Sequence, residues 1–183
     1  WLWPVKESIR KAGRTFSSML NLMDDYGEFR FIQSQPALYA MVEEHYPDVL
    51  SRIKKRVKDG RWEPNGGMWV EADCNVTGGE SLVRQFLEGR KKTLALFGYK
   101  GDTLWLPDVF GYSAALPQIL KQCDIQSFVT SKINWNDTNL FPYDTFWWQG
   151  IDGTEVFTHY INTRTHGYNA SPYPEIMQET WSF

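Results

Sequence analysis

Short runs of apolar and aromatic residues alternate along this chain with stretches in which apolar residues recur every three or four positions. The first pattern is typical of buried strands and the second of amphipathic helices. Strand–helix alternation predicts parallel strands joined by helical crossovers. In such folds the chemistry lies at the carboxyl ends of the strands. We therefore expect an α/β protein of parallel strands with flanking helices, and a barrel or an open sheet would both fit the pattern.

The boundaries of the expected elements come from proline, capping and turn signals. Proline is favoured in the first turn of a helix, and Thr77 with Glu80 forms a capping box. Helices are expected to begin near Pro4, Pro36, Pro47, Thr77 and Ser113. Strands are expected at 29–33, 68–70, 103–106 and 127–130, with a hairpin whose arms are 146–148 and 154–157.

Composition excludes several classes of function. A net charge of −3 over 183 residues gives no basic field that would attract nucleic acid. No apolar run reaches the roughly 18 residues that a membrane span needs. The two cysteines, Cys74 and Cys123, make neither a disulfide framework nor a zinc motif, which favours a reducing, cytoplasmic compartment. The chain begins at Trp1 without a methionine, and we expect the natural protein to begin earlier.

Three polar clusters follow expected strands, at 33–35, 71–75 and 108–113. Asp108 is the strongest candidate for chemistry among them. An aspartate before a helix is often its N-cap, but Ser113 is better placed for that role. Asp108 is therefore interpreted as a carboxylate at the mouth of a pocket.

Aromatic residues make up 16% of the chain, and many of its 9 Trp and 9 Tyr stand beside Asp, Asn or Gly. Exposed rings of this kind stack well on sugar faces. Large rings are equally common in protein cores, so the enrichment alone leaves both interpretations open.

The segment 105–119, which contains Pro107-Asp108-Val109-Phe110-Gly111, resembles the nucleophile segment of the glycoside hydrolase family 38 α-mannosidases. Other segments resemble the same family in the same order. They are 1–7, 66–73, 79–86 and 131–136. The similarity is greatest to the branch that holds bacterial enzymes and the cytosolic animal enzyme.

The resemblance implies that residues 1–183 are part of the N-terminal catalytic domain, a seven-stranded β/α barrel whose first and later strands lie outside the chain. It also implies one divalent metal ion, zinc or cobalt. Asp108 would be one ligand, and the other ligands, from a His-x-Asp motif before Trp1 and a histidine after Phe183, would lie outside. The general acid/base would also follow Phe183. The chain alone is expected to be inactive and to bind its metal poorly.

The resemblance also implies roles for individual residues. Asp108 would be both the nucleophile and a metal ligand, Trp1 would form part of the sugar platform, and Phe110 would line the mannose site. Lys132 takes the position of a basic residue that faces this site. Asp73 is a candidate pocket residue or else a hydrogen-bond acceptor within its loop. His166 falls where the family presents an aromatic side chain near the substrate, and no second histidine at ligand spacing supports metal binding there.

The predicted function is hydrolysis of terminal α-mannosides with retention, through a covalent glycosyl-enzyme on Asp108. The predicted partner is an α-mannoside oligosaccharide or glycan, with no nucleic acid and no membrane, and a homo-oligomer is compatible with the sequence. One alternative is a metal-dependent carbohydrate deacetylase, which would need a histidine pair near an aspartate. The other is a non-catalytic carbohydrate-binding fragment, although binding modules are usually β-sandwiches.

Overall fold

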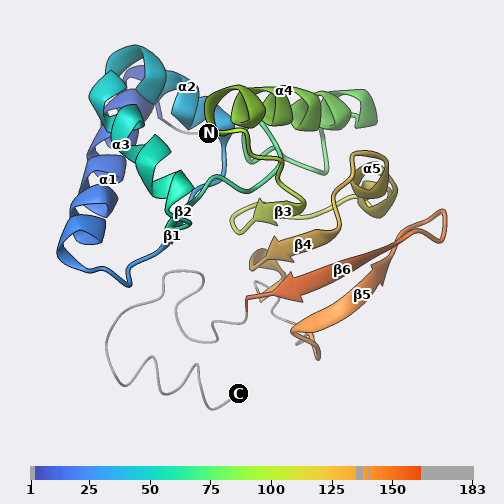
Figure 1. Ribbon diagram of the computed structural model, residues 1–183. Helices are drawn as coiled ribbons and strands as arrows, with labels where there is room; N and C mark the ends of the chain where they lie inside the picture. The colour runs from blue at the N-terminus through green and yellow to red at the C-terminus, as the bar shows by residue number, and fades with distance from the viewer. Residues whose placement is uncertain (1–2, 135–137, 140, 162–183) are drawn as a thin grey trace. The chain divides into compact units, whose positions relative to one another are not determined.

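The computed structural model describes residues 3–134, 138–139 and 141–161 (Figure 1). The chain divides into two compact units. The first comprises residues 1–70 and 85–101, and the second comprises 71–84 and 102–183.

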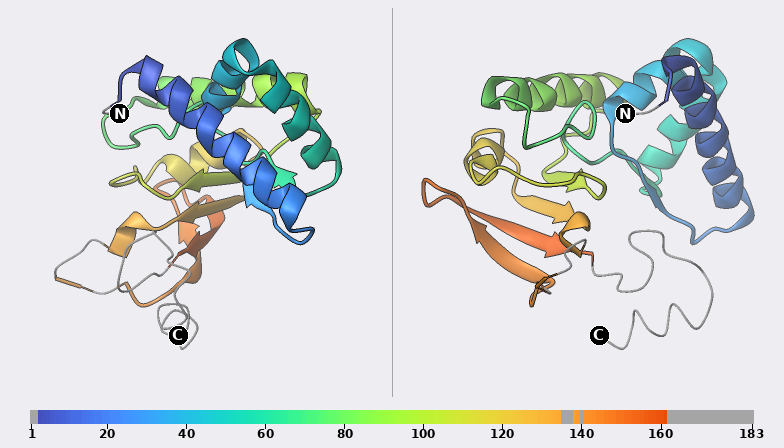
Figure 2. Two further views of the ribbon diagram at one scale, coloured as in Figure 1. Left: turned by 90° about the vertical axis from the view of Figure 1, so that its left-hand side faces the viewer. Right: turned by 180° about the vertical axis from the view of Figure 1, so that it is seen from behind.

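The first unit is mainly helical. Its elements are α1 (Val5–Asp25), β1 (Phe31–Ile32), α2 (Pro36–His45), α3 (Pro47–Lys58), β2 (Trp62–Glu63) and, from residue 85 on, α4 (Gly79–Phe97). Prolines 36 and 47 stand in the first turns of α2 and α3, as predicted. α1 and α3 pack side by side (Figure 2). β1 and β2 form a short parallel pair in which Phe31 lies opposite Trp62.

The core of this unit is organised around Trp62, which is fully buried. The Phe16 and Phe31 rings meet it edge-on, with centroids 5.3 and 4.8 Å away. The Trp62 indole Nε1 donates to the Tyr39 hydroxyl at 2.8 Å, and that hydroxyl donates to the Gln33 carbonyl at 3.2 Å. The polar atoms of both large rings therefore have partners inside the core, as burial requires.

The predicted strand at 68–70 is wrong. The backbone N–H groups of Trp69 and Val70 donate to the main-chain and side-chain oxygens of Gln85 on α4, both at 2.9 Å. The backbone N–H groups of this segment therefore bond to a helix and not to a neighbouring strand. The approach is close because α4 has a glycine here: a Cβ on Gly89 would lie 2.4 Å from the carbonyl oxygen of Gly67.

The second unit contains a four-stranded sheet in the order β3-β4-β6-β5. Its elements are β3 (Thr103–Leu106), α5 (Leu116–Gln122), β4 (Ser127–Thr130), the 3-10 turn η1 (Lys132–Asn134), β5 (Thr145–Gln149) and β6 (Glu155–Tyr160). β3, β4 and β6 are parallel, and β5 returns antiparallel to β6, which confirms the predicted strands and hairpin (Figure 1). α5 begins later than expected, and Ser113 Oγ accepts from the Ala115 N–H at 3.2 Å in the turn before it.

The register of this sheet aligns its carboxyl edge. Leu106 of β3 pairs with Thr130 of β4, which pairs with Tyr160 of β6. All three residues are fully buried. Segments that leave the ends of β3 and β4 therefore start at the same level, side by side.

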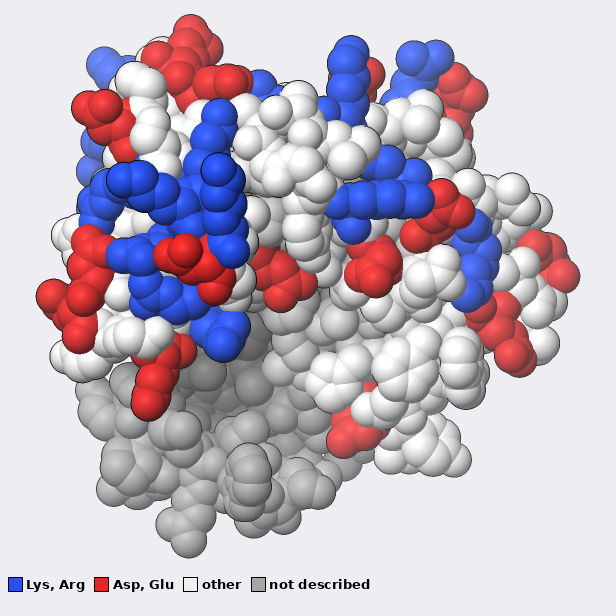
Figure 3. All heavy atoms as spheres, viewed as in Figure 1, with Lys and Arg blue, Asp and Glu red and all other residues white. Residues whose placement is uncertain are grey.

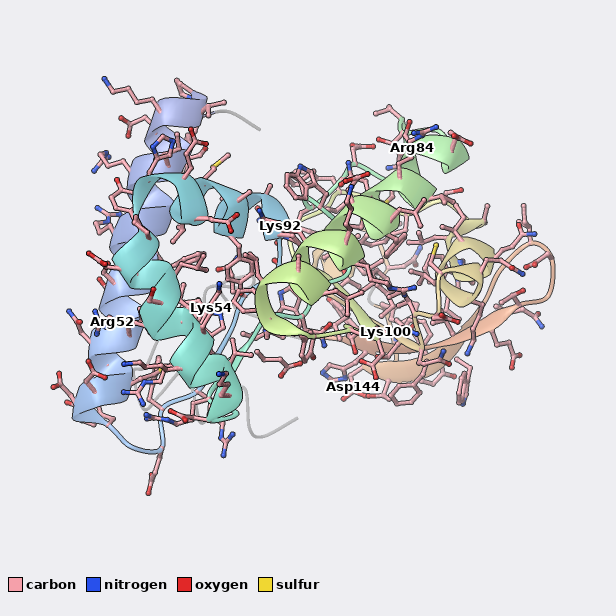
Figure 4. All side chains as sticks on the ribbon, turned by 45° about the horizontal axis from the view of Figure 1, so that its top comes forward. Arg52, Lys54, Arg84, Lys92, Lys100 and Asp144 are labelled. Atoms are coloured by element: carbon pink, nitrogen blue, oxygen red, sulfur yellow. The ribbon has the colours of Figure 1, made fainter. Side chains whose placement is uncertain are left out.

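Surface charge on the first unit is mixed. Lysine and arginine gather over α1–α3 in Figure 3, with acidic side chains among them. Asp24 of α1 binds Arg52 and Arg56 of α3, and its hydrogen bond with Arg56 is the main cause that lowers the pKa of the Asp24 carboxyl. Figure 4 labels Arg52 on α3 and Lys92 on α4, and Lys92 pairs with Glu43 on α2. No helix in the described residues has the length and apolarity to cross a membrane.

Gly89→Ala is expected to lower the free energy of unfolding by about 1–3 kcal/mol, because backbone atoms at 67–69 would have to move. Alanine normally stabilises a helix interior by roughly 0.5–1 kcal/mol relative to glycine. Gly79→Ala is the matched control, since a Cβ there meets only Ile119 Cδ1 at 3.9 Å. Urea titration of both variants checks this, and equal midpoints would contradict the close approach at Gly89.

Candidate active site

Asp108 and Lys132 occupy equivalent positions on neighbouring parallel strands. Asp108 lies two residues beyond Leu106, the end of β3, and Lys132 lies two residues beyond Thr130, the end of β4. The aligned register brings the two side chains together, and Lys132 Nζ lies 2.8 Å from Asp108 Oδ1. The predicted placement of both residues at the carboxyl edge of the strands is thus what the structure shows.

The two members of this ion pair differ in burial. The Lys132 side chain is 4% exposed, whereas that of Asp108 is 43% exposed. Asp108 Oδ1, which faces the ammonium, is itself buried. The exposed surface of Asp108 therefore belongs to side-chain atoms other than Oδ1.

An exposed aromatic ring lies beside the pair. Lys132 Nζ is 4.9 Å from the centroid of the Phe110 ring, a cation–π distance. Phe110 is 57% exposed. The structure thus brings together three residues that the sequence singled out: Asp108, Phe110 and Lys132.

Hydroxyl groups hold the turn that carries Asp108, and the sequence did not identify them. Tyr112 Oη lies 3.1 Å from the Leu106 carbonyl oxygen and 3.0 Å from that of Val109. Thr130 Oγ1 forms a short hydrogen bond with the same phenol. Ser131 Oγ donates to the Pro107 carbonyl at 2.5 Å. Burial raises the pKa of Tyr112 above its usual range, so the phenol keeps its proton. The available signal was the run Thr-Ser-Lys, which begins at the last residue of an expected strand.

Asp73 lies in a loop and does not follow a strand, contrary to the prediction. Its Oδ1 accepts from the backbone N–H groups of Asn75 and Val76, both at 2.8 Å, so it is a hydrogen-bond acceptor within its loop. The loop nevertheless lies next to the Asp108 segment, because Cys74 forms a parallel bridge with Tyr112. A role for Asp73 toward a ligand stays a prediction.

Trp1 and His166 lie outside the described residues. Within those residues no group of three or more His, Cys, Asp or Glu side chains could hold a metal ion. Asp108 offers a carboxylate of the kind that zinc binds, but a zinc site needs three or four converging protein ligands. The described residues therefore supply one candidate ligand, and the rest of a metal site would have to come from elsewhere.

A carboxylate, a buried lysine and an exposed ring at the carboxyl ends of adjacent parallel strands are typical of α/β enzyme sites. The family described as "Glycosyl hydrolases family 38 N-terminal domain" matches residues 1–182, and the chain belongs to this family.

Curated relatives of the chain are alpha-mannosidases. The chain is 42% identical to Alpha-mannosidase G of Dictyostelium discoideum over 98% of its own length, and 44% identical to Alpha-mannosidase 2C1 of Homo sapiens over 93%. It covers 17% and 16% of those proteins, so it spans about a sixth of their length.

Solved structures share the fold. An alpha-mannosidase from Enterococcus faecalis V583 superposes with a TM-score of 0.76 at 20% identity, over 100% of this chain and 21% of that one. A protein from Mycobacterium smegmatis described as a polysaccharide deacetylase gives 0.60 at 11% identity, over 96% and 60%. At these identities the likeness concerns the fold alone, and it confirms the barrel-type α/β class that the sequence predicts.

Because Lys132 is more deeply buried than Asp108, we expect the loss of either partner to change the free energy of unfolding by a different amount. Asp108→Ala should destabilise the protein by about 2 kcal/mol or more, because it leaves a buried ammonium without its carboxylate. Lys132→Met should cost less than about 1 kcal/mol, because the carboxylate left behind is partly hydrated and the thioether fills the same space. The double variant should be more stable than Asp108→Ala alone. Thermal unfolding of the four proteins checks this cycle, and strictly additive effects would show that the pair is not coupled.

Proposed function

We propose that the protein is a retaining α-mannosidase in which Asp108 is the nucleophile. The observation that carries the proposal is the position of Asp108, at the carboxyl end of β3 with one oxygen held by Lys132. Membership of family 38 supports it, as do the names of the relatives, which are alpha-mannosidases.

The chemistry follows from the open carboxylate. In the first step an Asp108 oxygen attacks the anomeric carbon, and the bond from that carbon to the leaving oxygen breaks as an acid protonates it. Water then hydrolyses the resulting glycosyl ester with the same group acting as base, so the configuration is retained. That acid/base is proposed to lie outside the described residues. Lys132 fixes Asp108 Oδ1 throughout, and the Phe110 ring offers an apolar face to the sugar.

We also propose one divalent ion, zinc or cobalt, with Asp108 as one of its ligands and the others outside the described residues. When bound, such an ion polarises sugar oxygens and helps to fix the ring. The exposed part of the Asp108 carboxylate suits this role, because Lys132 already occupies the side of Oδ1.

The proposed substrate is a terminal α-mannoside of an oligosaccharide or glycan, and the proposed compartment is the cytoplasm. Both cysteines, Cys74 and Cys123, are buried thiols, which agrees with a reducing environment. Only the shared fold supports the deacetylase alternative. The described residues contain no histidine cluster beside Asp108, which that activity would need.

Asp108→Asn in the natural full-length protein should lower kcat on an aryl α-mannoside by more than about 10³-fold. The amide can still accept from Lys132, so the fold should persist, but it cannot act as a nucleophile. Asp102→Asn is the matched control, since Asp102 stands just before β3, at its opposite end. Retention of more than about a tenth of the wild-type kcat in Asp108→Asn would be incompatible with a nucleophile.

Removal of the metal should abolish turnover. Dialysis of the full-length protein against a chelator is expected to remove activity, and zinc or cobalt should restore it. Asp108→Asn should also retain less metal than Asp102→Asn when metal content is measured by elemental analysis. Full activity after the metal has been shown to be absent would refute the proposed cofactor.

A further inference from the structure

The turn from Leu106 to Val109 is held through three of its backbone carbonyl groups. Tyr112 Oη reaches the oxygens of Leu106 and Val109, and Ser131 Oγ donates to that of Pro107. These carbonyls flank Asp108 on both sides. The position of the Asp108 side chain is therefore set by hydroxyls outside the turn as well as by Lys132.

The hydroxyls of Tyr112 and Thr130 are linked. The Tyr112 phenol has one proton and lies within hydrogen-bond distance of the Leu106 and Val109 carbonyls and of Thr130 Oγ1. Because a carbonyl cannot donate, Thr130 Oγ1 donates to the phenol whenever the phenol donates to a carbonyl. Thr130 is fully buried, so its hydroxyl is oriented within the protein and not by bulk water. Thr130 thus acts on the turn through Tyr112.

We propose that Tyr112, Thr130 and Ser131 are positioning residues for Asp108, and that the relay from Thr130 through Tyr112 fixes the turn so that the carboxylate meets the anomeric carbon in line. The inference rests on the proposed function of Asp108 and extends it to groups that touch no substrate. Each of three successive residues at the end of β4 has its own contact: Thr130 bonds to the phenol, Ser131 holds the Pro107 carbonyl and Lys132 holds the carboxylate.

Tyr112 could instead serve the fold alone, and a tyrosine in the first unit distinguishes the two roles. Tyr39 in the first unit is fully buried, accepts from Trp62 Nε1 and donates to the Gln33 carbonyl. Tyr39→Phe therefore also removes a tyrosine hydroxyl that bonds to a backbone carbonyl. Thr158 on β6 matches Thr130 in the same way, being buried with its Oγ1 bonded to the Val156 carbonyl.

The test measures kcat, KM and the unfolding midpoint of the full-length enzyme on an aryl α-mannoside. Tyr112→Phe should lower kcat about tenfold or more with KM changed less than about twofold, because small misplacements of a reacting group are costly. Thr130→Val should lower kcat as well, and Thr130→Ser, which keeps the hydroxyl, should restore most of it. The double variant Tyr112→Phe/Thr130→Val should be no slower than Tyr112→Phe, because Thr130 acts through the phenol. Tyr39→Phe and Thr158→Val should keep wild-type kcat.

Equal kcat in Tyr112→Phe and Tyr39→Phe would overturn the inference, and so would additive losses in the double variant. If Tyr112→Phe does not fold, the Thr130→Val and Thr130→Ser pair decides alone, since both are close in shape to threonine. Asp108→Asn separates the two proposals. If that variant stays active, the nucleophile assignment fails, whereas an inactive Asp108→Asn beside a fully active Tyr112→Phe refutes only the positioning role.

Discussion

A buried ammonium group sets the requirements for the rest of the second unit. Lys132 is 4% exposed at its side chain, and a charge so far from water is stable only with an opposite charge beside it. Asp108 supplies that charge at 2.8 Å, which is possible because β3 and β4 end at the same level. A shift of one residue in this register would turn the side chains to the other face and separate the pair.

The apolar core supports that register and extends to the turn. The Tyr112 ring packs edge-on against Phe128 of β4, with centroids 5.0 Å apart, and Trp148 of β5 contacts both rings. The same side chain therefore has two functions. Its ring is part of the core between the strands, and its hydroxyl, at the end of that ring, bonds to the carbonyls around Asp108. Packing in the core and placement of the carboxylate are thus linked through one residue.

Much of this arrangement could be predicted from the sequence, for identifiable physical reasons. Proline at the start of α2 and α3 and the apolar runs of β3 and β4 are local signals, and the structure agrees with them. Asp108 could be singled out because Ser113 was the better candidate for the N-cap of the next helix. That N-cap prediction is wrong, because the N-cap of α5 is Ala115 and Ser113 Oγ accepts from the Ala115 N–H in the turn before it.

The missed features depend on partners that are distant in the sequence. The segment 68–70 looked like a strand because it is apolar, but its backbone bonds to Gln85 on α4, which no local pattern reveals. The role of Thr130 is equally hidden, since a threonine in a strand is ordinary until the register places it against Tyr112. Distance in sequence, and not weakness of the interaction, made these contacts unpredictable.

The ion pair is better explained by chemistry than by stability. An apolar side chain of similar length at position 132 would fill the same space without the cost of removing an ammonium from water, and replacements of that kind are often neutral or stabilising. The Lys132–Asp108 attraction is further weakened because Asp108 is 43% exposed and partly screened by solvent. What the lysine does supply is a fixed positive charge 2.8 Å from one oxygen of a carboxylate whose side chain is 43% exposed. A nucleophile needs a carboxylate that is held in position and still accessible to a substrate. An ion pair of this kind adds little to the stability of an apolar core.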